Sequence, residues 1–422
     1  MFVLLNTFLG LKHSVIIDDE TLSITIKIND QIAEFRSTFF DRSDNLELSI
    51  KDCVVSDSEV KMGSKSLRIT SLFSGDIEVN NDVRFPIDIL GSTFFMLTRY
   101  EEHVNPMRDE HGRFPTKESL AYKHGFLHRP IVNEYVELLW AILQEMGCTQ
   151  LRKRWNYKLV PTHDVDIPFL FDGIFKSLRS ISGFIKRGRY AELGRYVSHR
   201  LTNRDPFDTY DMFMDLSEKQ GVKSNFFFLQ KGSAKQDKNN NISSPKIRKL
   251  IKHIKFRGHN VGFHPSYNAY NDPELYQSEK NKLEEVVGEP VVSGRNHYLR
   301  WDVAKSPRLW ENNEMSWDST LGYADHAGFR CGVCYPFPLY DLENDCQLDV
   351  HERPLIAMEW SLIHYQGLDL EGCRSYIDLL RSEVKKYQGE FVFLYHNSSF
   401  FVDEYYYFGH KLIKLFFTSS VK

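Results

Sequence analysis

Residues 155–166 read WNYKLVPTHDVD, and this stretch determines how the rest of the chain is interpreted. The apolar run before Pro161 has the length and composition of a buried strand, which we expect Pro161 to end. Asp164 and Asp166 follow directly. Chains that alternate strands with helices gather their chemistry at the carboxyl ends of strands, so these two carboxylates mark a candidate site.

From residue 155 onward, strand-like and helix-like segments alternate. We expect strands at 157–161, 224–229, 260–264, 291–294, 316–319, 329–333, 355–358 and 391–395. We expect helices at 206–220, 244–256, 273–287, 303–312 and 370–387. Alternation predicts a parallel sheet, and this many repeats favours a (β/α) barrel. We assign this α/β domain to residues 151–422.

Residues 1–150 predict a smaller α+β domain. Strands are expected at residues 1–10, 22–28 and 66–71, and helices at 85–102 and 132–146. The sequence YEEH at 100–103 resembles a carboxylate–histidine cluster, but we interpret it as the solvated end of an amphipathic helix.

Composition excludes several classes of protein. At 422 residues the chain is too long for one ordinary domain, and its net charge of -4 does not favour nucleic acid. No stretch reaches the roughly 18 apolar residues of a membrane span. Six irregularly spaced cysteines suit reduced thiols in a cytoplasmic protein, and the pair Cys331/Cys334 has no second pair at zinc-site spacing.

Residues 171–204 form a basic segment with eight Lys or Arg against Asp172 and Glu192, with aromatic residues interleaved. Such a segment is compatible with peripheral contact at the inner face of a membrane or with a lipid-linked substrate. A plain solvated helix face is the alternative, and KNNNI at 238–242 is interpreted as a solvated loop.

Alternate residues at a strand end face the same way, so Asp164 and Asp166 can reach one point. One carboxylate can bind a metal while the other removes a proton from water. A pair of capping aspartates and the nucleotide-sugar site of a metal-dependent glycosyltransferase remain alternatives. His264 ends the strand of GHNVGFHPSY at 258–267, and a histidine there favours hydrolysis; we interpret His259 as structural.

Two later strand ends carry further polar residues. Arg295 begins RNHYLRW at 295–301, where it can orient a carboxylate and where His297 can act as a ligand or substrate contact. His396 ends the strand FVFLYH at 391–396, the position expected of a general acid.

Taken in order, these motifs resemble the polysaccharide deacetylase (NodB-like, carbohydrate esterase family four type) superfamily over roughly 155–400. Thr162-His163-Asp164 with Asp166 is similar to its first motif and 264–268 (HPSYN) to its second, with Asn268 where a second histidine is usual. Residues 295–298 and 394–396 resemble its arginine and final histidine motifs. Residues 1–150 resemble the accessory domain of some bacterial members.

The resemblance implies a distorted (β/α) barrel and a role for each matching residue. The implied catalytic residues are Asp164 as base, His396 as acid, Arg295, and Asp318 as support for His396. The implied ligands of a divalent metal, expected to be Zn²⁺, are Asp166, His264, His297 and Asn268. Substrate contacts are expected from Tyr267, Tyr298, Arg300 and Trp301.

The resemblance therefore implies a hydrolase that removes an N-acetyl or other acyl group from an amino sugar of a bacterial surface polysaccharide or its lipid-linked precursor. Two alternatives remain open. One is a glycan-binding or scaffold protein on a decayed barrel, which Asn268 motivates. The other is a glycosyltransferase that uses Asp164 and Asp166.

Overall fold

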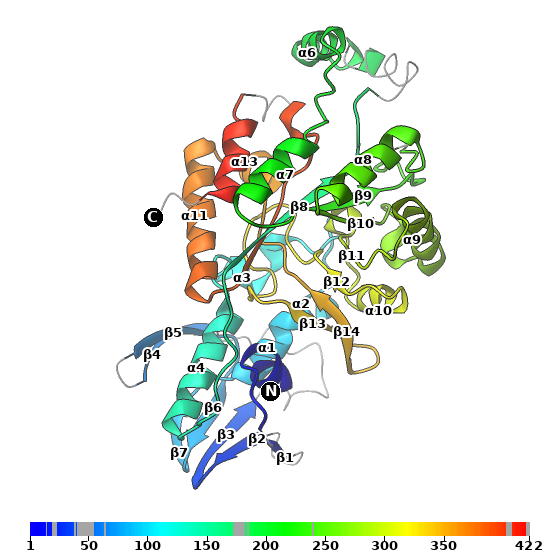
Figure 1. The fold of residues 1–422 in the computed structure, drawn as a ribbon. Helices are drawn as coiled ribbons and strands as arrows, with labels where there is room; N and C mark the ends of the chain where they lie inside the picture. Colours follow the sequence, from blue (N-terminus) through cyan, green and yellow to red (C-terminus); the bar gives the residue numbers. More distant parts are fainter. Residues whose placement is uncertain are drawn as a thin grey trace.

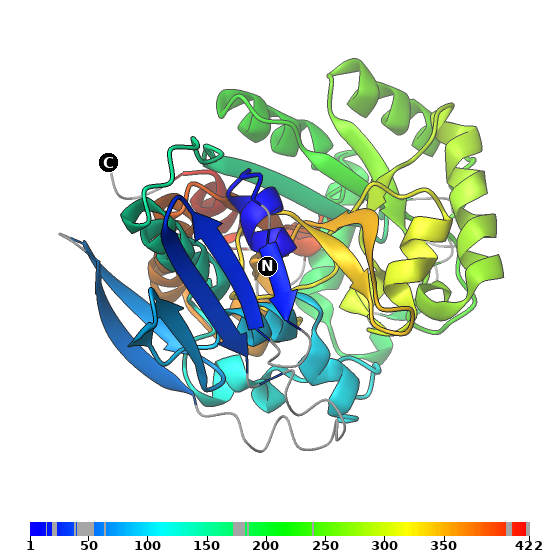
Figure 2. The same ribbon diagram turned by 90° about the horizontal axis from the view of Figure 1, so that it is seen from below.

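The computed structural model describes residues 1–13, 15–18, 23–37, 39, 55–62, 65–171, 182–183, 185–238, 240–401 and 407–418. An N-terminal group of strands and helices lies below a larger α/β assembly in Figure 1. Figure 2 shows the N-terminal sheet from below, with the larger assembly behind it.

The N-terminal unit, residues 1–150, combines antiparallel strands with short helices. Its five-stranded sheet has the order β1-β2-β3-β6-β7, and β4 pairs separately with β5. The strands are β1 Val15–Asp18, β2 Ser23–Ile28, β3 Gln31–Ser37, β4 Ser56–Met62, β5 Lys65–Ser71, β6 Gly75–Val79 and β7 Asp82–Phe85. The helices are α1 Ile89–Leu97, α2 Tyr100–Val104, α3 Leu120–Lys123 and α4 Ile131–Glu145.

The strand expected at the N-terminus is wrong. Val3–Phe8 is a short π-helix that buries Leu4, Leu5 and Phe8. This burial explains the apolar composition that suggested a strand, because a single helical face can hold the same residues. The expected helix at 85–102 is interrupted instead of continuous, since Arg99 takes a left-handed conformation with φ 55° between α1 and α2.

Residues 151–418 contain a nine-stranded, mainly parallel sheet in the order β13-β14-β12-β11-β10-β9-β8-β16-β15. Its strands are β8 Lys158–Val165, β9 Asn225–Leu229, β10 Asn260–His264, β11 Ser293–Gly294, β12 Trp317–Asp318, β13 Phe337–Asp341, β14 Cys346–Glu352, β15 Ala357–Met358 and β16 Glu390–Leu394. The described strands β13 and β15 are edges, so hydrogen bonds do not close the sheet into a barrel. The fold is mixed α/β with a parallel-strand sheet.

Helices surround this sheet, except α6, which projects away from it (Figure 1). They are α6 Tyr190–Leu201, α7 Tyr210–Lys219, α8 Pro245–Phe256, α9 Pro273–Val287, α10 Ser306–Asn312, α11 Leu370–Lys386 and α13 Gly409–Phe417. The sequence patterns locate five of these helices. These patterns do not predict α13.

Pro161 does not end the first strand, contrary to expectation. β8 continues to Val165, and its pairing with β9 begins only at Thr162. The Pro161 carbonyl accepts a hydrogen bond from the Asn225 side chain instead of a backbone N–H. The missing N–H of proline therefore leaves no gap in the ladder with β9, and the strand carries Asp164 within it.

Residues 329–333 form a buried turn instead of a strand, and the adjacent hairpin of β13 and β14 was not predicted. The turn contacts the N-terminal unit, because Arg330 donates to both oxygens of Glu102 and its carbonyl accepts from Arg99. Glu102 and Glu101 are buried, so residues 100–103 are not a solvated helix end. They form part of a buried ionic contact between the two parts of the chain.

Within the described part of the chain, no helix is both long and apolar enough to cross a membrane. The basic segment predicted for membrane contact is described only in part, since residues 172–181 and residue 184 lie outside the described residues. α6 projects from the upper end of the assembly in Figure 1 and exposes Tyr190, Val197 and Leu201. Membrane contact through this segment stays a prediction.

Candidate metal centre

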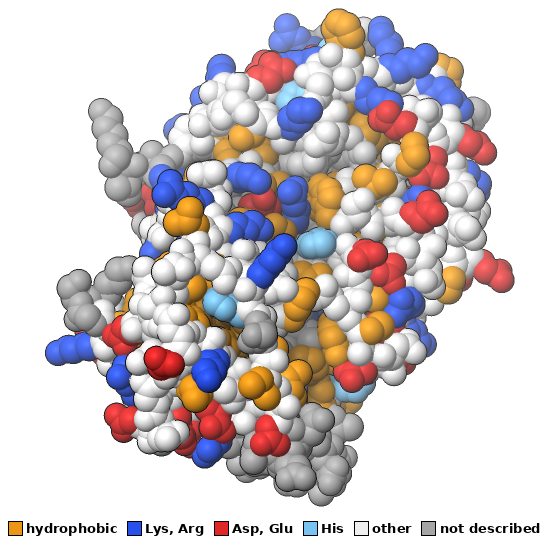
Figure 3. All heavy atoms as spheres, turned by 60° about the horizontal axis from the view of Figure 1, so that its bottom comes forward, with side chains coloured by type: hydrophobic (Ala, Val, Ile, Leu, Met, Phe, Trp, Pro, Cys, Tyr) orange, Lys and Arg blue, Asp and Glu red, His pale blue; other side chains and the backbone are white. Residues whose placement is uncertain are grey.

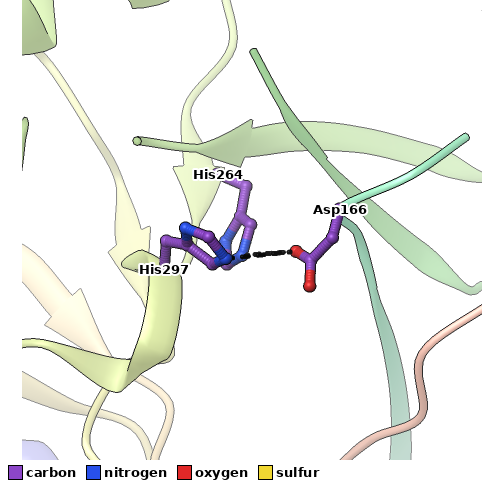
Figure 4. Close-up of side chains that lie close together, drawn as sticks. All are labelled: Asp166, His264 and His297. Atoms are coloured by element: carbon purple, nitrogen blue, oxygen red, sulfur yellow. Dashed lines mark ion pairs between the residues drawn. The ribbon is translucent and has the colours of Figure 1, made fainter. Parts of the chain in front are cut away.

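The ends of neighbouring parallel strands bring three potential metal ligands together. Asp166 follows β8, His264 ends β10 and His297 lies three residues beyond β11. Their ligand atoms all lie within 4.8 Å of one another. Figure 4 shows both imidazoles pointing toward the carboxylate of Asp166.

One oxygen of Asp166 is available to a ligand. Its Oδ1 lies 3.3 Å from His264 Nε2 and 3.7 Å from His297 Nε2. This buried oxygen makes no hydrogen bond to any described residue. A buried carboxylate oxygen without a partner is costly unless a ligand occupies the space beside it.

The hydrogen bonds of both histidines leave Nε2 directed at this space. His264 Nδ1 donates to the Arg295 carbonyl at 2.6 Å, and His297 Nδ1 lies 3.1 Å from Asp237 Oδ1. Such bonds fix the tautomer in which Nε2 offers a lone pair to a metal. Two imidazoles and one carboxylate, with a position left open, suit the catalytic type of zinc site. The residues therefore fit a divalent metal such as Zn²⁺.

The charges of the cluster reinforce one another. Burial would raise the pKa of Asp166, but the nearby histidines His297, His264 and His396 hold it well below its ordinary value. Burial would lower the pKa of His264, and the carboxylates of Asp164 and Asp166 raise it above its ordinary value. The pocket thus favours an anionic carboxylate beside positive charge, whether that charge is a proton or a metal ion.

Asp164 is held beside the metal ligands by a buried arginine. Arg295 Nη1 donates to Asp164 Oδ1 at 2.9 Å, and the other donors of Arg295 bind Thr162 Oγ1 and two oxygens of Ser319. Asp164 Oδ2 lies 3.7 Å from His264 Nε2. The arginine fixes one carboxylate oxygen and leaves the other directed into the pocket.

His396 faces the same pocket from the end of β16. Glu359 Oε1 accepts from the backbone N–H of His396 at 2.9 Å and lies 2.7 Å from its Nδ1. Burial lowers the pKa of His396, but Glu359 raises it more, to about 9. The ring is therefore protonated at neutral pH, and its Nε2 is able to donate a proton to a bound group.

A pocket of about 210 Å³ connects these side chains. Its polar lining consists of Asp164, Asp166, His264, His297, His396, Arg113 and Ser398. Its apolar and aromatic lining consists of Tyr298, Leu299, Ala324, Met358, Trp360, Tyr365 and Leu394. The candidate ligands Asp166, His264 and His297 thus border one space together with Asp164 and His396.

Two predicted roles do not fit the geometry. Asn268 is exposed at the start of the turn Ala269–Asn271 and does not line the pocket. Asp318 does not contact His396. It lies opposite Glu352 in the pairing of β12 with β14 and accepts from Thr320 Oγ1. Burial raises the pKa of Asp318 to about 6.

Of the four predicted substrate contacts, only Tyr298 lines the pocket. Trp301 is buried in the core. Arg300 donates to the carbonyls of His111 and Tyr267, and its guanidinium stacks on the Tyr267 ring. Arg300 and Tyr267 therefore hold the loops around the pocket together.

Sequence reasoning missed several residues of the site. Glu359 directly follows β15, so the strand-end rule that located His396 also applies to it. Asp237 directly precedes the loop at 238–242 that was interpreted as solvated, and Asn240 within that loop is buried and donates to the Asp166 carbonyl. Arg113 belongs to the N-terminal unit, and no local pattern places it at the pocket.

Comparison with known proteins defines little beyond this geometry. Residues 1–147 match a family described as "Family of unknown function (DUF7033)". No curated protein matches the chain.

Solved structures with similarity include a putative polysaccharide deacetylase from Mycobacterium smegmatis, at 16% identity and TM-score 0.39 over 64% of this chain and 86% of that one. A 4-alpha-glucanotransferase from Thermococcus litoralis has 13% identity and TM-score 0.37 over 62% of this chain and 37% of that one. A CE4 family pseudoenzyme from Bacillus anthracis has 9% identity and TM-score 0.29 over 90% of this chain and 89% of that one. At these scores the similarities carry no argument about function.

Proposed function

We propose that the chain is a metal-dependent hydrolase that removes an acyl group, such as N-acetyl, from an amino sugar of a bacterial surface polysaccharide or its precursor. The observation that supports this most directly is the cluster of Asp166, His264 and His297, whose ligand atoms all lie within 4.8 Å of one another. Asp164 and His396 border the same pocket, as base and acid must in hydrolysis of an amide.

Asp166, His264 and His297 would hold the metal. When bound, a divalent cation such as Zn²⁺ supplies Lewis-acid polarisation of the acyl carbonyl and makes water more acidic. The residues around it do the rest of the chemistry.

Asp164 Oδ2 takes the proton of the attacking water, while Arg295 keeps Oδ1 in place. The water oxygen bonds to the acyl carbon, and the carbon–nitrogen bond of the amide then breaks. His396 gives its Nε2 proton to the leaving nitrogen, and Glu359 stabilises the protonated ring before that transfer. The products are a carboxylic acid and the free amine of the sugar.

His297 favours hydrolysis over the scaffold and glycosyltransferase alternatives. The glycan-binding or scaffold reading depended on Asn268 in place of a histidine ligand, whereas His297 completes a three-residue cluster without it. The glycosyltransferase reading requires no histidines beside the aspartates. Hydrolysis uses every carboxylate and histidine that lines the pocket.

The test combines metal analysis with an acetate-release assay on N-acetylated amino sugars. We expect about one equivalent of zinc or a similar metal and release of acetate. Asp164→Asn should keep the metal and lose activity by about 10²–10⁴-fold, the usual contribution of a general base. Full activity in Asp164→Asn contradicts the base assignment, and a metal-free protein that binds sugar without acetate release favours the scaffold alternative.

A further inference from the structure

The loop at 105–118 brings the N-terminal unit to the candidate site. Arg113 lines the pocket together with Asp166 and His396. His111 Nδ1 lies 3.1 Å from the Tyr267 hydroxyl, and the His111 ring is 4.7 Å from the Tyr298 ring. Part of the pocket wall therefore belongs to the segment that matches a family of unknown function.

This loop and the loop after β11 hold each other. Arg113 Nη1 donates to the Tyr298 carbonyl at 3.3 Å, and Arg300 Nε donates to the His111 carbonyl at 2.8 Å. Tyr298 has φ 62°, a left-handed conformation that non-glycine residues keep only where the surroundings impose it. The ring of Tyr298 lies 4.8 Å from that of the metal-ligand candidate His297. The N-terminal loop thus helps to fix the rim of the metal centre.

A second hollow of about 500 Å³ adjoins the pocket. The two share Arg113, Leu299, Ala324 and Tyr365. The other walls of the hollow come from residues 107–117 of the N-terminal unit and 322–325 of the larger assembly. The pocket alone is smaller than the roughly 300–1,000 Å³ of typical ligand sites, whereas the pocket with its hollow falls within that range.

The chemistry of the hollow suits a neutral polar ligand. The cations Arg113 and Arg330 are each paired with a carboxylate, Asp109 and Glu102 respectively. The remaining charges on its walls, Arg108 and Lys117 against Glu110 and Asp325, balance each other. Tyr365 and Tyr298 are both partly exposed, at 47% and 36%, near the junction with the pocket. Balanced hydrogen-bonding groups beside aromatic faces fit sugars better than they fit a polyanion.

We propose that the N-terminal unit is a substrate-recognition module. Its loop at 105–118 and residues 322–325 bind the sugars that adjoin the reacting amino sugar, and Arg113, at the junction, determines specificity for a chain over a single sugar. This inference rests on the proposed function, because it takes the pocket as the place where the acyl group is removed.

The test uses N-acetylglucosamine and its tetramer as substrates of the full chain loaded with zinc. For the wild type, kcat/KM for the tetramer should exceed that for the single sugar by tenfold or more. Arg113→Ala should remove about tenfold of this advantage, the value of a hydrogen bond to a charged donor, and the loss should fall on KM and not on kcat. Because Arg113 also holds the Tyr298 carbonyl at the rim of the pocket, turnover of the single sugar should fall as well, and the readout is the ratio of the two kcat/KM values.

Two further variants guard against a trivial loss of folding. Lys117→Ala removes an exposed residue of the outer hollow and should lower tetramer turnover alone. Arg84→Ala breaks a surface ion pair with Glu145 elsewhere in the N-terminal unit and should change neither substrate. Thermal unfolding of each variant shows whether it is folded. Equal kcat/KM for the two wild-type substrates, or an unchanged ratio in both Arg113→Ala and Lys117→Ala, overturns the inference.

Binding separates this inference from the proposed function. Calorimetry of zinc-loaded Asp164→Asn should show the tetramer binding at least tenfold more tightly than the single sugar. If the tetramer binds in this way but no acetate is released by the wild type, the deacylation proposal is wrong and the recognition role of the N-terminal unit is supported. If acetate is released but chain length changes neither binding nor turnover, the recognition role is wrong and deacylation is supported. Failure of the tetramer to bind contradicts the recognition role.

Discussion

Two stretches of this chain look alike in sequence and differ in the structure. YEEH at 100–103 and THDVD at 162–166 each place two carboxylates beside a histidine. In the first, Arg330 donates to both oxygens of Glu102, and Arg99 Nε donates to Oε1. In the second, Asp166 Oδ1 is buried without a hydrogen bond to a described residue. A completed ionic network joins parts of the chain, whereas an incomplete one leaves room for a ligand.

The pKa values do not distinguish the two clusters. Burial would raise the pKa of Glu102, but Arg330 and Arg99 lower it to about 2. The pKa of Asp166 is also held low, in its case by histidines. Both groups are therefore anionic near neutral pH, and what separates them is the partner, since arginines bind Glu102 whereas Asp166 lies in a cluster with His264 and His297. Figure 3 shows one face of the molecule, over which Lys and Arg side chains are interspersed with Asp and Glu side chains.

The largest expected effect is that of Asp166→Asn. The amide weakens metal binding and should lower deacylation by about 10³-fold or more, since metal catalysis contributes several kcal/mol. The metal-free protein should stay folded but lose part of its unfolding free energy, because the amide removes the ion pairs of Asp166 Oδ1 with His264 and His297. Zinc titration, acetate release and denaturant unfolding measure these effects.

The exposed residue Asp349 provides the matched control for that experiment. Asp349→Asn should leave zinc affinity and turnover unchanged. If Asp166→Asn binds zinc as the wild type does, the oxygen at the centre of the cluster is not a ligand, and the contrast with Glu102 has no functional meaning.

The reverse outcome is expected of Arg330→Met. It removes two of the three hydrogen bonds of Glu102 inside the protein and should cost about 3–5 kcal/mol of unfolding free energy. Zinc affinity of the folded protein should not change. Arg68→Met, which breaks a surface pair with Asp57, should cost less than about 1 kcal/mol. Equal losses in the two variants would show that the buried contact between the two parts of the chain is no stronger than a surface pair.

The parallel strands were the most predictable feature. The predicted strand 260–264 and helix 273–287 match β10 and α9 in full, because buried strands and amphipathic helices have characteristic patterns of apolar residues in the sequence. His264 and His396 followed from their positions at strand ends. β11, which has only two residues, still places Arg295 at the expected edge.

What the sequence did not predict depends on contacts between distant residues. Glu102 looked solvated because its partner Arg330 lies more than two hundred residues away. Asp318 was assigned to His396 by the family resemblance, but strand register places it opposite Glu352 instead. Arg113 reaches the pocket only because the N-terminal unit packs on the sheet. Local periodicity indicates which face of an element is buried, but it does not indicate which distant residues pack against that face.

The smallest expected effect concerns Glu359. Its carboxylate contacts the backbone and ring of His396, as the arginines contact the Glu102 carboxylate. Glu359 raises the pKa of His396 to about 9, so the acid form is present below that pH and is lost above it. Glu359→Gln removes the charge, and the pKa should fall toward the ordinary value of about 6.5. The alkaline limb of the kcat–pH profile should therefore move to lower pH. At pH 8 we expect kcat to fall by up to about thirtyfold, in proportion to the lost acid form.

The profile itself tests the assignment. The variant and the wild type should converge as the pH falls below 6, because His396 is then protonated in both, whereas a general loss of structure would lower kcat at every pH. Glu371→Gln changes a side chain that is 78% exposed and should leave the limb in place. If the alkaline limb of Glu359→Gln coincides with that of the wild type, His396 is not the acid. Glu359 would then be a satisfied buried charge like Glu102, and the functional cluster would reduce to the three metal ligands and Asp164.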